Sequence, residues 1–260
     1  MKVLCIVNPA AGRPKPILDS LNTFLSDQNI TFDILVTGTG AVVPPMPYDY
    51  SIIYGGDGTV TEYLAKLKMP VLVLHGGTAN VIAKSLRIPK DVCEALRLLT
   101  EGRVELFDSF TVNRRPAFLR AHTWAGVHMR PDKDSKRRSG IAAYLRTFLK
   151  GPSVQEQEYL VYVDGSKRKL RSNLMLVANF PHLGLANIRL DSRIDARDAK
   201  LDMLYDLDPL RLSKKHAAFE HLTVVTSRKQ PWAIDDKVHY YKRVRFKIVP
   251  RSVQLVVPCA

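Results

Sequence analysis

The stretch Ser51-Ile52-Ile53-Tyr54-Gly55-Gly56-Asp57-Gly58-Thr59 decides the fold of this chain. Its first part is apolar and β-branched, which predicts a buried strand, and its second part is a glycine loop. Residues 60–65 have helical character, so the loop is expected at a helix N-terminus, where anions are stabilised. Glycines let the backbone approach a phosphate and turn its N–H groups toward it. The stretch therefore predicts a strand, a phosphate-binding loop and a helix.

Asp57 is the carboxylate of this loop, and three interpretations account for it. It holds a Mg²⁺ ion that accompanies a nucleotide, or it takes a proton from a hydroxyl that attacks a phosphate. The third interpretation is structural, a strand–turn–helix junction in which Asp57 is the N-cap of the helix. The residues by themselves leave all three open.

Strand and helix patterns alternate over the first hundred residues. The expected strands are 2–7, 31–36, 50–54 and 71–74, and the expected helices are 14–27, 60–67, 79–86 and 91–100. This alternation predicts a Rossmann-like α/β domain, in which helices cover both faces of a parallel sheet. Ligands bind such sheets at the carboxyl ends of the strands. Three loops fall there, at 8–12, 55–59 and 76–80, so we expect them to converge on one site.

Strand patterns dominate after residue 105. We predict a nucleotide-binding α/β domain over 1–105 and a mostly antiparallel β-sandwich domain over 106–260. Helical patterns are expected within the second domain at 140–150 and 210–221. The first of these has an apolar stripe with basic flanks, which fits a core-packed helix or an amphipathic helix at a membrane surface.

The net charge of the 260-residue chain is +14, which predicts attraction to an anionic partner. The basic residues gather in clusters, at 136–138, 167–171, 214–215 and 242–247. Few aromatic residues alternate with them, so a nucleic-acid partner is not expected. The three cysteines have no metal-ligand spacing, and no apolar run reaches the roughly 18 residues that cross a bilayer. We expect a cytoplasmic protein that is peripheral to the membrane.

Three motifs together resemble the diacylglycerol kinase catalytic domain family. They are Asn8-Pro9-Ala10-Ala11-Gly12, Gly55-Gly56-Asp57-Gly58-Thr59 with Glu62, and Gly77-Thr78-Ala79-Asn80 followed by Leu86-Arg87-Ile88-Pro89. The family includes bacterial lipid kinases, sphingosine kinases and ceramide kinases, and it is related in fold to NAD kinases. The resemblance is specific over the first 110 residues or so, and Ala233–Pro258 is similar to the closing strands of the family.

The resemblance implies a lipid kinase that transfers the γ-phosphate of MgATP to the hydroxyl of a lipid such as diacylglycerol or a sphingoid base. The β-rich domain would take the lipid, at an anionic membrane surface. Asp57 and Asp235 are the implied catalytic carboxylates, and metal ligands are not assigned. The implied nucleotide-binding residues are Asn8, Thr37, Gly55, Gly56, Gly58, Thr59, Glu62, Gly77, Thr78 and Asn80.

The chain departs from the family in the second domain. Where the family has Asp-Gly-Glu near its end, this chain has Asp235-Asp236-Lys237. Loss of a positioned acid costs about 10²–10⁴ in rate, and a lysine reverses the local charge. The Asp-Gly-x-Leu-Asp motif, near which the family often binds a structural cation, is Asp198-Ala199-Lys200-Leu201-Asp202 here.

Other functions stay open beside a lipid kinase. The departures favour a catalytically impaired, nucleotide- and membrane-binding member of the same fold. An NAD kinase is a further enzyme alternative, although the loop 77–80 does not favour it. A nucleic-acid-binding protein would explain the charge but not the glycine loops. His75 is either a loop residue near phosphate or a residue that fills a turn.

Overall fold

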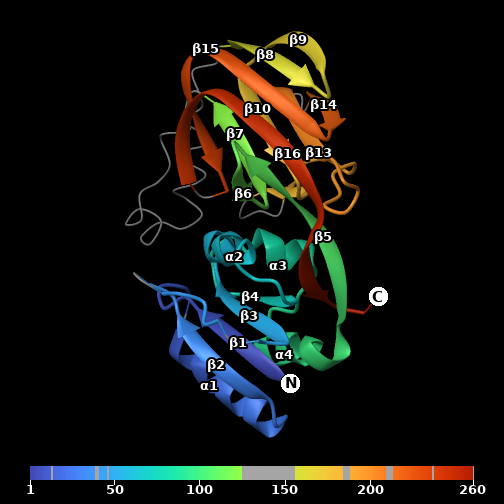
Figure 1. Cartoon of the computed structure of the whole chain (residues 1–260). Coiled ribbons are helices and arrows are strands. Elements are labelled where there is room, and N and C mark those ends of the chain that lie inside the picture. Colours follow the sequence, from blue (N-terminus) through green and yellow to red (C-terminus); the bar gives the residue numbers. More distant parts are fainter. Residues whose placement is uncertain are drawn as a thin grey trace. The chain divides into compact units, whose positions relative to one another are not determined.

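A computed structural model describes residues 1–12, 14–38, 41–45, 47–124, 156–183, 188–208, 213–235 and 237–259. The chain forms two compact units, described separately below (Figure 1). The first unit comprises Met1–Phe107, His182–Leu190 and Arg251–Ala260, and the second comprises Asp108–Pro181 and Asp191–Pro250. The predicted division after residue 105 lies close to the first crossing. It does not include the two later segments that return to the first unit.

The first unit is a parallel sheet between two pairs of helices. The strands β1 (Lys2–Val7), β2 (Thr31–Val36), β3 (Tyr50–Gly55) and β4 (Val71–His75) are parallel and lie in the order β2-β1-β3-β4. The helices are α1 (Pro14–Asp27), α2 (Asp57–Leu64), α3 (Val81–Ser85) and α4 (Val92–Glu101). Helices α1 and α4 pack together, and Figure 1 shows them on the other face of the sheet from α2 and α3. The predicted α/β fold is confirmed.

Burial explains why the inner strands are apolar runs. Strands β1, β3 and β4 are buried almost along their whole length, as expected for parallel strands covered on both faces. Strand β2 is at an edge and is largely exposed. The opposite edge is extended by the end of β16 (Lys237–Val257), where Leu255 pairs with Val71 in parallel. The last residues of the chain therefore complete a sheet that the first residues begin.

The second unit is a mostly antiparallel sheet, as predicted. Its strands are the end of β5 (Arg103–Val112), β6 (Arg115–Ala117), β7 (Arg120–Trp124), β8 (Gln157–Val163), β9 (Ser166–Ser172), β10 (Leu174–Ala178), β13 (Leu201–Asp208), β14 (Ser213–Phe219), β15 (His221–Ile234) and most of β16. Strand β15 pairs with β8 near its start and with β7 near its end, so the sheet changes partners along one strand. Apolar side chains from these strands share one core, in which Trp232, Tyr159 and Phe246 are buried.

The predicted helix over 210–221 is wrong, because β14 occupies Ser213–Phe219. It pairs with β13 so that Phe219 faces Leu201 and Ala217 faces Met203. Pairing with a buried strand outweighs a weak local helical preference. The predicted helix over 140–150 and the basic cluster at 136–138 lie outside the described residues.

Candidate active site

The three glycine-containing loops all follow strands of the first unit at the same edge of its sheet. They follow β1, β3 and β4, and the strand order reverses between β1 and β3. Such a reversal is the topological switch point at which open α/β sheets bind ligands. Thr37 lies at this edge as well, because its N–H donates to the carbonyl of Val7 at 2.9 Å. The predicted convergence of the loops is therefore present in the fold.

Asn8 connects the loop after β1 to helix α2. Its Nδ2 donates to Oγ1 of Thr59 at 2.7 Å, and its backbone N–H donates to the carbonyl of Tyr54 at 2.9 Å. The Oδ1 atom of Asn8 accepts from the N–H of Ala10 at 2.9 Å, which shapes its own loop. Two predicted nucleotide-binding residues, 51 positions apart, are thus in direct contact across the switch point.

Close approach of two loops explains their glycines. A Cβ on Gly76 would lie 2.6 Å from the nitrogen of Gly55, and a Cβ on Gly77 would lie 2.3 Å from Cα of Gly56. A Cβ on Gly55 would lie 2.6 Å from Cβ of Thr59. Real Cβ atoms essentially never come this close to other heavy atoms. These glycines are therefore required by packing within the protein, a reason that the sequence did not reveal.

Asp57 is the first residue of α2, and Gly56 is the N-cap, so the interpretation of Asp57 as the N-cap is wrong. The Asp57 Oδ1 atom accepts a hydrogen bond from the N–H of Ile82 at 3.1 Å, in the first turn of α3. This bond orients the carboxylate and ties the loop after β3 to the loop after β4. Asp57 lies at the N-terminus of α2, where the helix dipole stabilises negative charge.

Asn80 closes the loop after β4. It adopts a left-handed conformation (φ 50°, ψ 46°). Its Oδ1 accepts from the N–H of Gly77, and its Nδ2 donates to the carbonyl of Gly77, both at 2.7 Å. Thr78 stands exposed within this closed turn. The loop thus presents Thr78 from a backbone that is held at both ends.

Glu62 is placed apart from Asp57. Five residues along an α-helix correspond to a rotation of about 140° beyond one full turn, so the two carboxylates leave α2 on different sides. The exposed Glu62 side chain lies 3.5 Å from Nζ of Lys66, in the turn that follows the helix. Nucleotide binding by Glu62 stays a prediction that this arrangement does not favour.

His75 and His182 make contacts that the sequence left undecided or did not reveal. The Nε2 atom of His75 lies 2.9 Å from the carbonyl oxygen of Ile88, so it donates and fixes the chain between α3 and α4. His182 begins the hairpin of β11 (His182–Leu183) and β12 (Ile188–Arg189), and its Nδ1 lies 2.9 Å from Oγ of Ser85 on α3. These partners are 97 positions apart, so no local sequence pattern signals the contact.

The residues that form this site coincide with a known domain. Residues 2–112 match the family model of the diacylglycerol kinase catalytic domain. This part of the chain resembles that family. The match covers β1 through β5 and includes all three loops of the site.

Comparison with whole proteins extends the likeness beyond this domain. A Staphylococcus epidermidis protein named "Putative lipid kinase" is 25% identical over 236 residues, which cover 80% of this chain and 76% of the relative. A Staphylococcus haemolyticus protein with a similar name is 23% identical over 235 residues, again 80% and 76%. A solved structure titled as a diacylglycerol kinase from Bacillus anthracis has the same fold, with a TM-score of 0.79 at 19% identity over 98% of this chain and 96% of that one.

Asp235, the second predicted catalytic carboxylate, belongs to the second unit and is held by backbone groups. Its Oδ1 accepts from the N–H groups of Leu119 and Arg120 at 2.9 and 3.1 Å, and its Oδ2 accepts from Phe118 at 3.0 Å. Burial raises the pKa of Asp235, and these donors act in the opposite direction. The carboxylate thus closes the turn between β6 and β7, and its catalytic role stays a prediction.

The segment that replaces the family's Asp-Gly-x-Leu-Asp motif is held by internal bonds. Ala199 stands at the glycine position with φ 61°, a left-handed conformation, and its N–H donates to Oδ2 of Asp108 at 2.7 Å. Asp202 is buried, with Oδ1 2.6 Å from Nε2 of His216. Burial raises the pKa of Asp202, against the hydrogen bond from His216, which lowers it. Within the described residues, no three His, Cys, Asp or Glu side chains are grouped to hold a metal ion.

Proposed function

We propose that this chain is an ATP-dependent lipid kinase, which transfers the γ-phosphate of MgATP to the hydroxyl of a lipid such as diacylglycerol or a sphingoid base. The observation that supports it most is the bonded convergence of three loops inside the diacylglycerol kinase catalytic domain. Asn8 joins the first loop to α2, and Asp57 joins α2 to α3, the helix that follows the third loop. The names of the relatives, which call them lipid kinases, favour a lipid acceptor.

The nucleotide phosphates would lie at the N-terminus of α2. The first N–H groups of a helix have no acceptor within the helix, and its dipole favours an anion there. Gly56, Gly58 and Thr59 would face the phosphates from this end, with Asn8 and Thr78 contributing from the adjacent loops. The absence of bulk at Gly55 and Gly77 keeps these loops close enough to act on one ligand.

Asp57 would supply the carboxylate that phosphoryl transfer needs. Mg²⁺ is usually bound by one or two carboxylates together with substrate phosphates and water, so one oriented carboxylate at this loop fits it. The ion neutralises phosphate charge when it is bound with ATP. The N–H of Ile82 fixes the orientation of the Asp57 carboxylate, whether it binds that ion or accepts the proton of the attacking hydroxyl.

The test is Asp57→Asn with the purified chain, MgATP and a panel of diacylglycerols and long-chain bases. An asparagine keeps an oxygen that accepts from Ile82, so the fold and the nucleotide-dependent rise in melting temperature are expected to persist. Phosphoryl transfer is expected to fall by about 10²–10⁴ because the charge is lost. If the variant transfers phosphate at the wild-type rate, Asp57 has no part in the reaction. If the wild-type chain phosphorylates no lipid of the panel, the proposal of a lipid kinase is refuted.

A second candidate is a nucleotide- and membrane-binding protein without catalysis. It is favoured by Lys237 at the position of the family acid and by the three backbone N–H groups that engage Asp235. In that case ATP raises the melting temperature of the wild-type chain, yet no lipid of the panel becomes phosphorylated. Lys237→Glu then tests why transfer is absent. Phosphoryl transfer by this variant would show that the wild-type chain is inactive because it lacks the family acid.

A lipid kinase must reach a substrate that resides in a bilayer. None of the helices in the described part of the chain is long and apolar enough to cross a membrane.

A further inference from the structure

Four adjacent strands of the second unit, β9, β8, β15 and β16, align their residues in rows across the sheet. One row contains Val161, Val224 and Val244, each at most 1% exposed and part of the core. Neighbouring residues of a strand point to opposite faces. The two rows on either side of this buried row therefore point outward.

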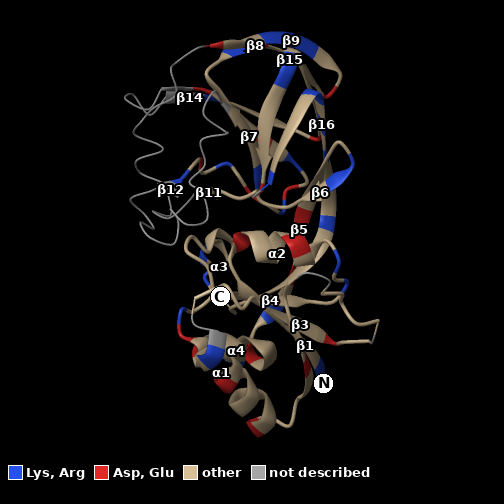
Figure 2. Cartoon of the chain, turned by 90° about the vertical axis from the view of Figure 1, so that its left-hand side faces the viewer, with Lys and Arg blue, Asp and Glu red and all other residues tan. Residues whose placement is uncertain are grey.

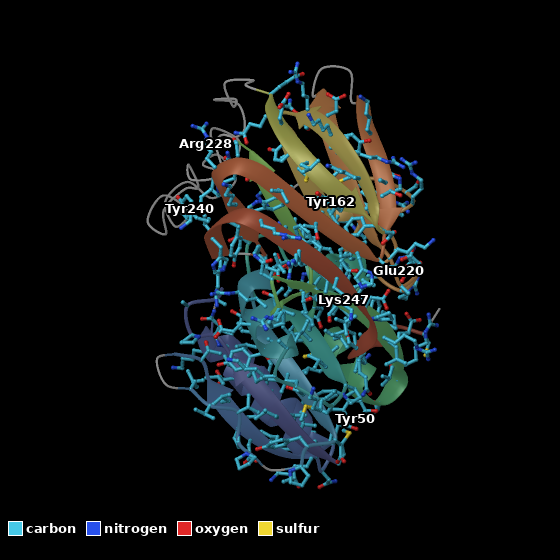
Figure 3. The ribbon with its side chains drawn as sticks, turned by 45° about the horizontal axis from the view of Figure 1, so that its top comes forward. Tyr50, Tyr162, Glu220, Arg228, Tyr240 and Lys247 are labelled. Atoms are coloured by element: carbon cyan, nitrogen blue, oxygen red, sulfur yellow. The ribbon has the colours of Figure 1, made fainter. Side chains whose placement is uncertain are left out.

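The outward rows carry cations at both ends. One row runs Lys167, Tyr162, Thr223, Arg245, and the next runs Lys169, Leu160, Val225, Arg243. The lysines and arginines are exposed, whereas the four residues between them are half-buried. Lys247 extends the arginine side by one further outward position. We call Lys167, Lys169, Arg243, Arg245 and Lys247 the basic face; Figure 3 labels Tyr162 and Lys247, and Figure 2 shows the blue stretch of β9.

The charge of the basic face is uncompensated in the described residues. Arg171, on the same side of β9, is paired with Glu158 at 2.9 Å. By contrast, none of the five cations of the basic face has a carboxylate within 4 Å in the portion of the chain that the structure describes. Asp164 and Glu220 lie at the adjoining turns, and the Asp164 carboxylate accepts from the N–H groups of Glu220 and His221.

The backbone beneath the two arginines is held in place. Asn113, in the turn after β5, donates from Nδ2 to the carbonyl of Arg243 at 3.1 Å and accepts at Oδ1 from the N–H of Arg245 at 2.9 Å. Its own N–H donates to the carbonyl of Arg245 at 2.9 Å. The arginine side of the basic face therefore projects from a rigid strand rather than from a loop.

We propose that the basic face binds an anionic lipid bilayer. Two lines of cations flank a strip of Leu160, Tyr162 and Val225, so long basic side chains meet phosphate groups while apolar and aromatic groups face the interface between them. A nucleic-acid duplex would also meet the cations, but its phosphate surface offers no counterpart for the apolar strip. The choice of a bilayer rests on the proposed function, because the substrate of a lipid kinase lies in one.

The test compares two double variants that lose the same charge from the same two strands. The outward variant, Lys169→Gln with Arg243→Gln, removes the two charges of one outward row. The neighbour variant, Arg168→Gln with Lys242→Gln, removes the charges of their sequence neighbours, whose side chains point to the other face. Each cation beside an anionic leaflet changes affinity by about five-fold. At about 0.1 M salt the outward variant is therefore expected to bind phosphatidylcholine–phosphatidylglycerol vesicles about 30-fold more weakly than wild type. The neighbour variant is expected to bind within about three-fold of wild type, since screening at this salt concentration limits charge effects to about 10 Å.

Vesicle cosedimentation over a salt series, with melting temperatures to establish that both variants fold, decides the matter. If both variants weaken vesicle binding equally, the effect comes from net charge and not from the basic face, which would overturn the proposal. Unchanged binding of the outward variant would overturn it too. So would a loss confined to binding of a duplex DNA of matched charge, which would assign the face to nucleic acid.

Activity separates this proposal from the proposed function. If the chain is a lipid kinase but the basic face does not bind the bilayer, the outward variant phosphorylates lipid in vesicles as fast as wild type. If the basic face binds the bilayer but the chain is not a lipid kinase, no variant transfers phosphate and the two variants still differ in vesicle binding. If both are right, the outward variant loses activity on vesicles and keeps it on lipid dispersed in uncharged detergent micelles.

Discussion

Gly77→Ala tests the reason for the glycines in the two loops after β3 and β4. The added Cβ would lie 2.3 Å from Cα of Gly56 and 3.1 Å from Oδ1 of Asn80. Carbon atoms pack at about 3.5–4.0 Å, so the two loops must separate by more than about 1 Å. Both partners are held, one by the backbone and one by the bonds of Asn80 to Gly77. Overpacking of this kind costs about 1–3 kcal/mol of unfolding free energy.

The matched control is Gly56→Ala on the opposite loop. Its Cβ would meet Cα of Gly77 at 3.4 Å, an ordinary contact, and Gly56 has an extended backbone that alanine adopts freely. Its small effects, a weaker helix cap and a less flexible unfolded chain, have opposite signs, so we expect a change within about 0.5 kcal/mol. Gly38→Ala is a second control, because nothing lies within 4 Å of its Cβ.

Urea denaturation of the nucleotide-free chain measures these differences without any contribution from a ligand. Equal unfolding free energies for Gly77→Ala and wild type would refute the reasoning, since the loops would then not be in contact. Equal losses in Gly77→Ala and Gly56→Ala would refute it as well, because the two contact distances differ. In a kinase assay, a displacement of about 1 Å at the loops is expected to lower the rate about 10²-fold.

Three further predictions concern other parts of the chain. Ala199→Gly should raise the free energy of unfolding by about 0.5–1 kcal/mol in denaturant, because a left-handed alanine costs about 1–2 kcal/mol and the glycine loses part of that to entropy; Gly165→Ala, at φ 87°, should lower it by a similar amount. Tyr48→Phe removes the phenol that donates to Asp33 at 2.8 Å, the main cause that lowers the pKa of Asp33. NMR titration of the variant should show the pKa of Asp33 rising toward 3.8. The ionised form of Asp33 stabilises the wild-type fold above pH 3.8, and this contribution disappears as the pH falls below 3.8, so wild type should lose more stability at low pH than the variant. Thr59→Val removes the hydroxyl that accepts from Nδ2 of Asn8, so it should lower the free energy of unfolding by about 1 kcal/mol in denaturant and weaken the ATP-induced rise in melting temperature. An unaltered rise would exclude this contact from the nucleotide site.

Much of the parallel unit follows from local patterns. The runs 2–7, 31–36, 50–54 and 71–74 are strands within one residue of the expected ends. For β1, β3 and β4 the reason is burial on both faces of the sheet, which favours continuously apolar strands. The loops fall at one edge because parallel strands share a direction. The antiparallel unit follows less well: 213–219 lacks a strong pattern of its own and becomes a strand through pairing with β13.

Local sequence accounts for the strands, the loops and the excess positive charge of this protein, because each is set by neighbouring residues or by composition. Tertiary structure decides what those features do. It gives Asp57 a partner at Ile82 and Asn8 a partner at Thr59, and it shows that glycines are needed where loops touch. Pairing of β9, β8, β15 and β16 sorts alternate basic residues onto one face. Contacts of this kind join positions far apart in the chain, and only the folded backbone sets their distances.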